Sequence, residues 1–142
     1  MASVGYSGTP LARKLGIKPA HHVVVLDGPA EFTTWLKPLP EGVELHNTLA
    51  LGNKPDIVIA FATSSAALRA AIESAAELIF PSGAIWASWP KRASKVPTDI
   101  TEDTVRDIAL PMGLVDNKVC AISEIWSGLR VVWRTELRSE RR

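Results

Sequence analysis

Apolar residues follow two alternating periods along the chain, and these periods predict alternating strands and helices. Continuous β-branched runs at residues 22–26 (HVVVL) and 56–62 (DIVIAFA) are typical of strands that are covered on both faces. A third apolar run, residues 84–89 (AIWASW), follows a segment in which four apolar residues share one helical face: Leu68, Ile72, Ala75 and Ile79. Residues 56–89 therefore predict a strand, a helix and a second strand that runs parallel to the first.

The flanking regions predict shorter elements. A Thr9-Pro10 start and a stop at Gly16 bound a first helix, in which Leu11 and Leu15 share one face. The remaining pattern predicts helices at residues 32–36 and 101–112 and strands at residues 43–46, 118–122 and 129–133. The connection between the last two strands contains the W-S-G sequence and is short enough for a hairpin.

This order of elements predicts one domain, residues 1–142, with the α/β fold of a three-layer Rossmann-like sandwich. We expect a mostly parallel sheet that closes with a C-terminal antiparallel hairpin, an N-terminal helix segment at residues 1–20 and a solvated tail at residues 135–142. An apolar share of 46% with 22% charged residues is ordinary for a globular domain and excludes a disordered chain.

Charge and cysteine content narrow the class of partner. A net charge of +1 provides no field that would attract nucleic acid or a membrane surface, so neither is expected as a partner. The single cysteine, Cys120, forms no internal disulfide, and residues 1–14 lack the apolar run of a signal peptide. We therefore expect a cytoplasmic protein.

The order of the elements also resembles a known fold family. A first helix, a central strand, the DIVIAFA strand, the PSGAIW strand and a C-terminal hairpin together resemble the second half of a class I S-adenosylmethionine-dependent methyltransferase domain, over roughly residues 20–134. The resemblance implies a glycine-rich loop after the first strand and an acidic residue at the end of the second strand, which together hold the cofactor.

The residues at those two places differ from what that cofactor requires. The first loop, LDGPAEF, contains one glycine, Gly28, and Pro29 removes a backbone donor. The second strand contains Glu44 but ends in His46 and Asn47. We therefore predict a degenerate methyltransferase-like fold that has no cofactor, and we keep an active methyltransferase as the least favoured alternative.

Three segments resemble a second family more closely: YSGTPLARKLGIKP, WPKRASKVPTDITED and LVDNKVCAISEIWSGLR. They span nearly the whole chain and are similar to an uncharacterised bacterial family of domains of unknown function, DUF3052. The family carries no established activity, so the resemblance implies only which segments to examine for function. These are residues 6–10, 89–91, 98–102, 116–118 and 126–130.

Three loops of the predicted fold meet at one edge of the sheet. Residues 27–28, 63–65 and 89–91 follow the carboxyl ends of parallel strands, and open α/β sheets bind their ligands at that edge. We assign the ligand site to the residues of these loops: Asp27, Gly28, Thr63, Ser64, Ser65, Trp89 and Lys91.

The chemistry of this edge favours an anionic or nucleotide-like small molecule. Ser64 and Ser65 lie at a helix start, where free backbone donors and the helix dipole attract negative charge. Lys91, Arg92 and Lys95 add positive charge beside them. The alternative is that the serines only cap the helix, that the basic residues form an ordinary solvated loop, and that the tryptophan packs on the core.

Other polar residues suggest no further site. His21 and His22 are adjacent, so they point to opposite faces of a strand, and His46 has no partner at the spacing of metal ligands; no metal site is expected. Cys120 is expected to be a small core residue, and Ser127 lacks a nucleophile elbow and an activating histidine, so no catalytic residue is expected. Three acidic residues are expected to begin a helix: Asp99, Glu102 and Asp103.

Tryptophan content provides a different class of hypothesis. Trp126 in the predicted hairpin turn, beside Arg130, is suited to a partner surface, because Trp and Arg are enriched among residues that dominate binding energy. The alternative function is therefore a protein interaction module, or a homodimer, on a methyltransferase-like fold. Trp126 packing over an edge strand is the competing structural interpretation.

Overall fold

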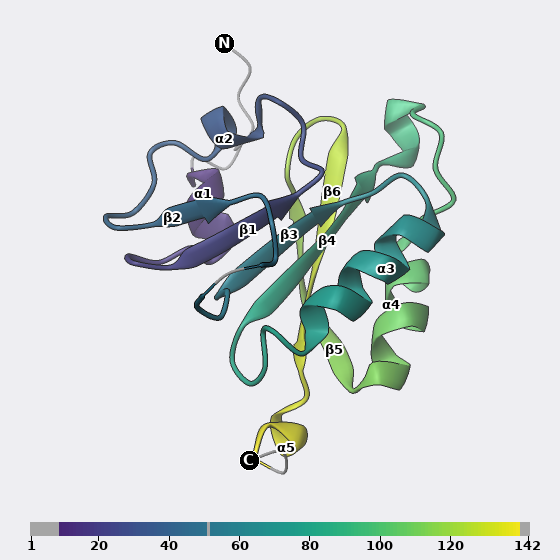
Figure 1. The fold of residues 1–142 in the computed structure, drawn as a ribbon. Coiled ribbons are helices and arrows are strands. Elements are labelled where there is room, and N and C mark those ends of the chain that lie inside the picture. Colours follow the sequence, from purple (N-terminus) through teal and green to yellow (C-terminus); the bar gives the residue numbers. More distant parts are fainter. Residues whose placement is uncertain (1–8, 51, 140–142) are drawn as a thin grey trace.

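The computed structural model describes residues 9–50 and 52–139, and a six-stranded sheet forms its centre (Figure 1). The strand order is β2-β1-β3-β4-β6-β5. The first four strands of this order are parallel, whereas β6 runs antiparallel to both β4 and β5. The strands are β1 (His22–Leu26), β2 (Glu44–His46), β3 (Ile57–Phe61), β4 (Ala84–Pro90), β5 (Leu114–Ala121) and β6 (Trp126–Trp133).

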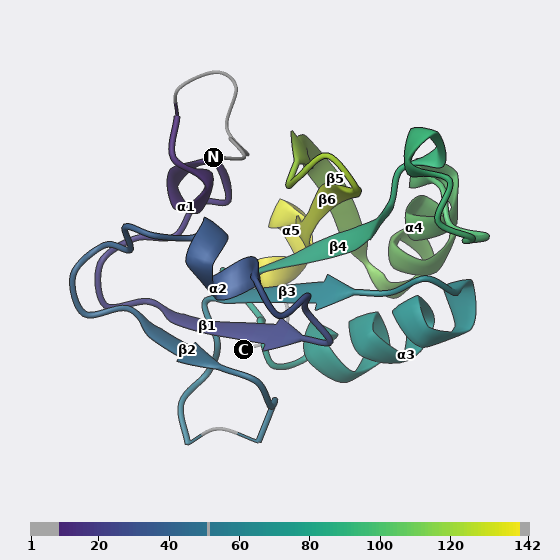
Figure 2. The ribbon, with the colours of Figure 1, turned by 90° about the horizontal axis from the view of Figure 1, so that it is seen from above.

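Helices cover both faces of the sheet, and the predicted three-layer α/β class is confirmed (Figure 2). One face carries α3 (Ser65–Ala76) and α4 (Glu102–Ala109), and the other carries the single-turn helices α1 (Leu11–Lys14) and α2 (Phe32–Trp35). The remaining elements are the 3-10 turns η1 (Arg92–Ser94) and η2 (Leu110–Met112) and the short helix α5 (Thr135–Arg138). Within the described ranges, every helix falls short of the length and apolar character needed to cross a membrane.

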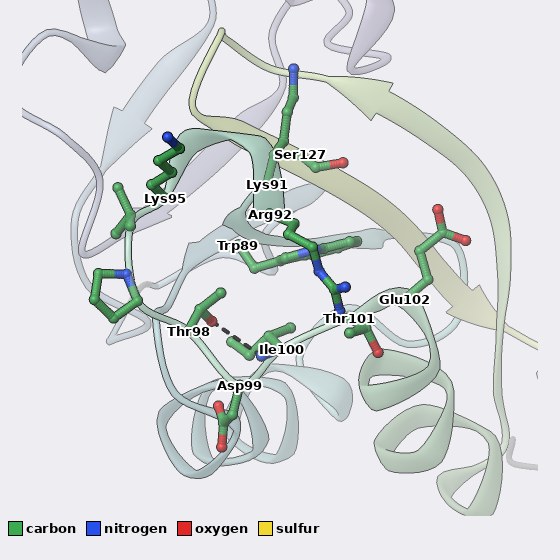
Figure 3. Close-up of a pocket in the computed structure, with 12 residues that line it drawn as sticks. Trp89, Lys91, Arg92, Lys95, Thr98, Asp99, Ile100, Thr101, Glu102 and Ser127 are labelled. Atoms are coloured by element: carbon green, nitrogen blue, oxygen red, sulfur yellow. Dashed lines mark hydrogen bonds between the residues drawn. The ribbon is translucent and has the colours of Figure 1, made fainter.

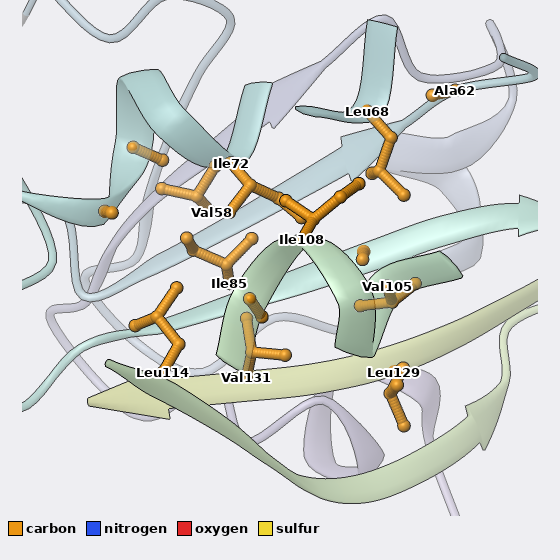
Figure 4. Close-up of a cluster of buried hydrophobic side chains, with 14 of the residues drawn as sticks. Val58, Ala62, Leu68, Ile72, Ile85, Val105, Ile108, Leu114, Leu129 and Val131 are labelled. Carbon is orange, nitrogen blue, oxygen red and sulfur yellow. The ribbon is translucent and has the colours of Figure 1, made fainter. Parts of the chain in front are cut away.

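Each face has its own apolar core. The α3–α4 core contains the helical stripe that the sequence predicted, with Leu68 and Ile72 packed against Val58 and Ile85 of the sheet (Figure 4). Each such fully buried side chain stabilises the fold by about 1.5–3 kcal/mol relative to exposure. The α1–α2 core lies on the opposite face, where the indole nitrogen of Trp86 donates to the Leu15 carbonyl at 3.0 Å.

The turn of the C-terminal hairpin lies earlier in the chain than the sequence predicted. The sequence placed the W-S-G segment in the turn, but Trp126 begins β6 and the segment pairs with the end of β4. The turn lies earlier, where the Ser123 hydroxyl accepts hydrogen bonds from the backbone N–H groups of Ile125 and Trp126. A serine that accepts nearby backbone N–H groups favours a turn, and here the effect of Ser123 is stronger than the turn preference of Gly128.

The first residues of the predicted solvated tail form a short helix, none of whose residues is fully buried. Residues 135–138 form α5, and Leu137 of this helix packs against the α3–α4 core. The Arg138 side chain also donates to the Trp133 carbonyl at 3.0 Å. A single leucine among charged neighbours was too weak a pattern to predict this packing, and residues 140–142 lie outside the described part of the chain.

Candidate functional site

The loops that follow β1, β3 and β4 lie at the same edge of the sheet. These three strands are parallel neighbours, so their carboxyl ends point the same way (Figure 1). The chain passes from β1 to β2 on one side and then to β3 on the other, so the strand order reverses at β1. An open α/β sheet binds its ligands beside such a reversal.

A cavity of about 580 Å³ opens at the end of β4, and we call it the Trp89 cavity. Apart from Ser127 of β6, its lining comes from one continuous segment, residues 89–102. Lys91 N–H donates to the Ile125 carbonyl at 2.7 Å, which ties the start of this segment to the hairpin turn. Trp89 is only 6% exposed and belongs to the α3–α4 core, so it forms a fixed base for the cavity (Figure 3).

The cationic side chains of the Trp89 cavity have no carboxylate partner. Among residues 9–50 and 52–139, neither Lys91, Arg92 nor Lys95 forms an ion pair. The two carboxylates of the wall are held elsewhere: Glu102 pairs with Arg106 of α4 at 3.0 Å, and Asp99 binds the start of α3. The cavity therefore presents positive charge that its own acidic residues do not neutralise.

Figure 3 shows the directions of the charged side chains in this cavity. Arg92 extends across the opening toward Thr101, whereas Lys91 extends the opposite way, and Asp99 turns toward α3. Burial raises the pKa of the Cys120 thiol, and the charges of Lys14, Lys118 and Lys91 act in the opposite direction. Arg92 therefore faces the opening, whereas the sequence reading assigned Lys91 to the site and treated Arg92 only as added charge.

The anion-binding position at the start of α3 is already occupied by a carboxylate of the chain itself, that of Asp99. The Ser65 N–H and hydroxyl donate to the two carboxylate oxygens of Asp99 at 2.7 and 2.9 Å. These hydrogen bonds hold the pKa of Asp99 below its ordinary value. The Ser64 hydroxyl accepts from the Ala67 N–H, which is an ordinary N-cap.

This arrangement corrects two predictions from the sequence. Ser64 and Ser65 were assigned to a bound anion, but both Ser65 donors bind Asp99 and the Ser64 hydroxyl accepts from the Ala67 N–H. Asp99 was expected to begin the following helix together with Glu102 and Asp103, but it caps α3 across a separation of 34 residues. Glu102 and Asp103 do lie in the first turn of α4, as predicted.

The seven residues predicted to form one ligand site lie in different places. Thr63 is exposed just before the N-cap Ser64 and does not line the Trp89 cavity. Asp27 and Gly28 line a second cavity of about 670 Å³ at the carboxyl ends of β1 and β2, which we call the β1–β2 cavity. Trp89 and Lys91 line the Trp89 cavity. The sequence reading named residues 98–102 as a segment to examine but did not place Thr98 and Thr101 in that wall, because their position depends on the path of a loop.

The β1–β2 cavity lacks the backbone approach that a nucleotide cofactor needs. A Cβ atom on Gly28 would lie 2.7 Å from Cγ1 of Val25 and 3.4 Å from Cε1 of Phe61. The glycine therefore makes room for the chain's own side chains rather than for a ligand. Pro29 offers no N–H in the same turn. These residues do not fit the glycine loop of an S-adenosylmethionine site, and we derive no methyl-transfer step from them.

The predicted partner surface is half-buried. Trp126 packs edge-on against Phe61 with a ring separation of 5.0 Å and contacts the α1–α2 core. Arg130 lies in the middle of β6 opposite Trp86, and desolvation lowers its pKa. Trp126 therefore covers the sheet instead of projecting from the turn, as the competing interpretation had it, because the turn lies at residues 122–125.

A cluster of two histidines and a glutamate on β1 and β2 was not expected from the sequence. Nδ1 of His22 lies 3.3 Å from Nε2 of His46, and one carboxylate oxygen of Glu44 lies 3.7 Å from each of these nitrogens. The expectation that His46 has no partner is wrong. It relied on spacing along the chain, whereas parallel pairing of β1 and β2 brings together residues that are 24 positions apart.

Comparisons with known proteins show the fold. No protein-family model and no curated protein matches the sequence. Among solved structures, the chain is similar to a SAM-dependent methyltransferase from Aquifex aeolicus, with a TM-score of 0.55, 14% identity, and 90% of this chain and 95% of that chain covered.

Two further structures agree. The release factor-specific protein-(glutamine-N5) methyltransferase from Alicyclobacillus acidocaldarius gives a TM-score of 0.54 at 11% identity, with 87% of each chain covered. Magnesium protoporphyrin IX methyltransferase from Synechocystis PCC 6803, with bound SAH, gives 0.53 at 14% identity and covers 87% of this chain and 78% of that one. This chain therefore has a methyltransferase-like α/β fold, and at such low identity the similarity extends no further than the fold.

Proposed function

We propose that this chain binds an anionic small molecule, such as a phosphorylated metabolite or a nucleotide, in the Trp89 cavity. The observation that carries the proposal is the charge imbalance of that cavity: its cations have no ion pair in the described chain, while Asp99 and Glu102 are engaged elsewhere. Arg92 is the principal ligand, because a guanidinium binds phosphate or carboxylate through two parallel hydrogen bonds. Lys95 adds charge at the rim.

The position and size of the cavity support this role. It lies at the carboxyl end of a parallel strand, and its volume of about 580 Å³ is within the range of small-molecule sites. Its wall is built by the WPKRASKVPTDITED segment, one of the three by which the chain resembles the DUF3052 family. Membership of that family remains part of the proposal.

A thermal-shift screen against nucleotides, phosphorylated metabolites, dicarboxylates and S-adenosylmethionine tests the proposal. A ligand at a hundredfold excess over its Kd should raise Tm by about 5–10 °C. Arg92→Ala should weaken binding of the best compound by roughly ten- to a hundredfold. Lys37→Ala is the matched control, because it removes the same charge from an exposed residue that does not line the cavity, and it should change affinity by less than about threefold.

Three results would count against this function. No shift with any anion would contradict it, and so would an equal loss of affinity in Arg92→Ala and Lys37→Ala, because equal loss indicates general attraction rather than a site. A shift produced only by S-adenosylmethionine and unaffected by Arg92→Ala would instead favour an active methyltransferase.

Self-association is the second candidate function, and the exposed outer strand favours it. β5 is an edge of the sheet, and two large apolar side chains on the hairpin are exposed, Val119 by 52% and Ile125 by 43%. A homodimer that pairs this edge should be detected by sedimentation and should dissociate in Val119→Lys. A monomer at all concentrations would exclude it.

A further inference from the structure

We propose that His22, Glu44 and His46 form a binding site for a divalent transition metal, with Zn²⁺ the best match. The site lies on β1 and β2 and is independent of the anion site. Parallel pairing aligns His22 with Glu44 and Val24 with His46. Since alternate residues of a strand share a face, both β2 side chains project on the same side as His22.

The separations of the three ligand atoms suit a metal ion. Bonds of about 2.0–2.1 Å in a tetrahedral centre place ligand atoms roughly 3.3–3.4 Å apart. Nδ1 of His22 and Nε2 of His46 are already 3.3 Å apart. The Glu44 oxygen lies 3.7 Å from each nitrogen, so it must approach by only a few tenths of an ångström. Glu44 is 63% exposed and has the freedom to do so.

The environment holds the two imidazoles in place. Their rings stack with an interplanar angle of 21°, and the side chains are only 23% and 25% exposed. The His22 N–H donates to the Asp56 carboxylate at 2.8 Å, and the Glu44 N–H donates to the His21 carbonyl at 3.0 Å, so the backbone of both strands is fixed at the site. Such preorganisation reduces the ordering cost of binding.

A contact behind His22 has the position of an outer-shell ligand. The side-chain amide nitrogen of Asn53 lies 3.5 Å from Nε2 of His22. With a metal on Nδ1, Nε2 carries a proton, and rotation of the amide presents its oxygen as the acceptor. Metal-bound histidines ordinarily donate their second N–H in this way.

The ligand set defines the chemistry of the site. Two imidazoles and one carboxylate are the ligands of many zinc centres that keep an open position, and the fourth place is left to water or to a small ligand. Imidazole and carboxylate favour Zn²⁺ and neighbouring transition metals over Ca²⁺ and Mg²⁺, which prefer all-oxygen sites.

Calorimetric titration of chelator-treated protein with Zn²⁺ at pH 7.5 tests the site. We expect one ion per chain, a more than about hundredfold loss of affinity in His46→Ala and roughly tenfold in Glu44→Gln. His21→Ala is the matched control, because this neighbouring histidine is outside the cluster, and it should leave affinity within about threefold. Absence of stoichiometric binding, or an equal loss in His21→Ala, would overturn the site.

A measurement on the unaltered protein keeps the test valid if a variant fails to fold. In nitrogen-15 spectra of the histidine rings, Zn²⁺ should shift Nδ1 of His22 and Nε2 of His46 while leaving His21 unchanged. A hydrogen-bonded histidine pair without affinity for metal would show neither shift, and that result would contradict the proposal.

Discussion

The start of α3 and the Trp89 cavity are neighbouring regions at one edge of the sheet. Both carry positive potential, but only the start of α3 is paired with a carboxylate of the chain. At α3, two donors of Ser65 bind the chain's own Asp99. In the cavity, Arg92 and Lys95 have no carboxylate partner in the described chain. A helix start or a basic loop is therefore available to a ligand only where the fold has not already supplied the anion.

The two regions are connected, because Asp99 belongs to both. Its carboxylate binds α3, and its backbone continues the cavity wall from Thr98 to Ile100. The bond between Asp99 and Ser65, which fills the anion position at the start of α3, therefore also positions the wall of the open Trp89 cavity. Substitutions in either region should separate the two roles.

The largest effect is expected at the base of the open cavity. Trp89→Ala should lower the free energy of unfolding by about 3–5 kcal/mol, because the side chain is 6% exposed and packs in the α3–α4 core. Chemical denaturation measures this loss, and Trp89→Phe should retain most of the stability. A loss below about 1 kcal/mol would show that the indole is not part of the core.

A smaller effect is expected at the β1 turn, the third loop of this edge. Gly28→Ala should cost about 1–3 kcal/mol, since the new Cβ would lie 2.7 Å from Val25. Gly52→Ala is the control, because a Cβ there meets nothing within 4 Å. Equal unfolding free energies for the two variants would contradict the packing role of Gly28 and reopen this turn to a cofactor.

Asp99→Asn tests the filled site through its pH dependence. The pKa of Asp99 is lowered in the folded state, so its stabilising contribution is complete above the unfolded pKa of about 4 and is lost as pH falls through the lowered folded pKa. The variant should therefore be modestly less stable at pH 7 and equal to the parent in strong acid. Asp107→Asn, which removes the same charge from the exposed face of α4, is the control in thermal unfolding. A constant difference at every pH would contradict the assignment.

The smallest effect concerns an unpaired group inside the sheet. The Ser88 hydroxyl is fully buried and has no hydrogen-bond partner among the residues that the structure describes, so Ser88→Ala should raise stability by up to about 1 kcal/mol. Ser123→Ala should lower it instead, because the Ser123 hydroxyl accepts two backbone N–H groups in the hairpin turn. Destabilisation in Ser88→Ala would indicate a partner for this hydroxyl and would contradict its unpaired state.

The sequence predicted elements well where burial repeats with a regular period. The β-branched run at β1 and the stripe of Leu68 and Ile72 in α3 are set by local pattern and appear where expected. Pairings between distant segments were not predictable in the same way. The bond from Ser65 to Asp99 depends on a loop path, and the approach of His22 to His46 depends on strand register.

A nitrogen-15 NMR titration with pyrophosphate tests the central claim most directly, since it reports on both regions in one experiment. The account predicts the largest shifts at the indole N–H of Trp89, the amides of Thr98 and Ser127, and the side chain of Arg92, with Ser65 and Ala67 nearly unchanged. Shifts concentrated at Ser65 and Ala67, or no shifts at millimolar pyrophosphate, would contradict it.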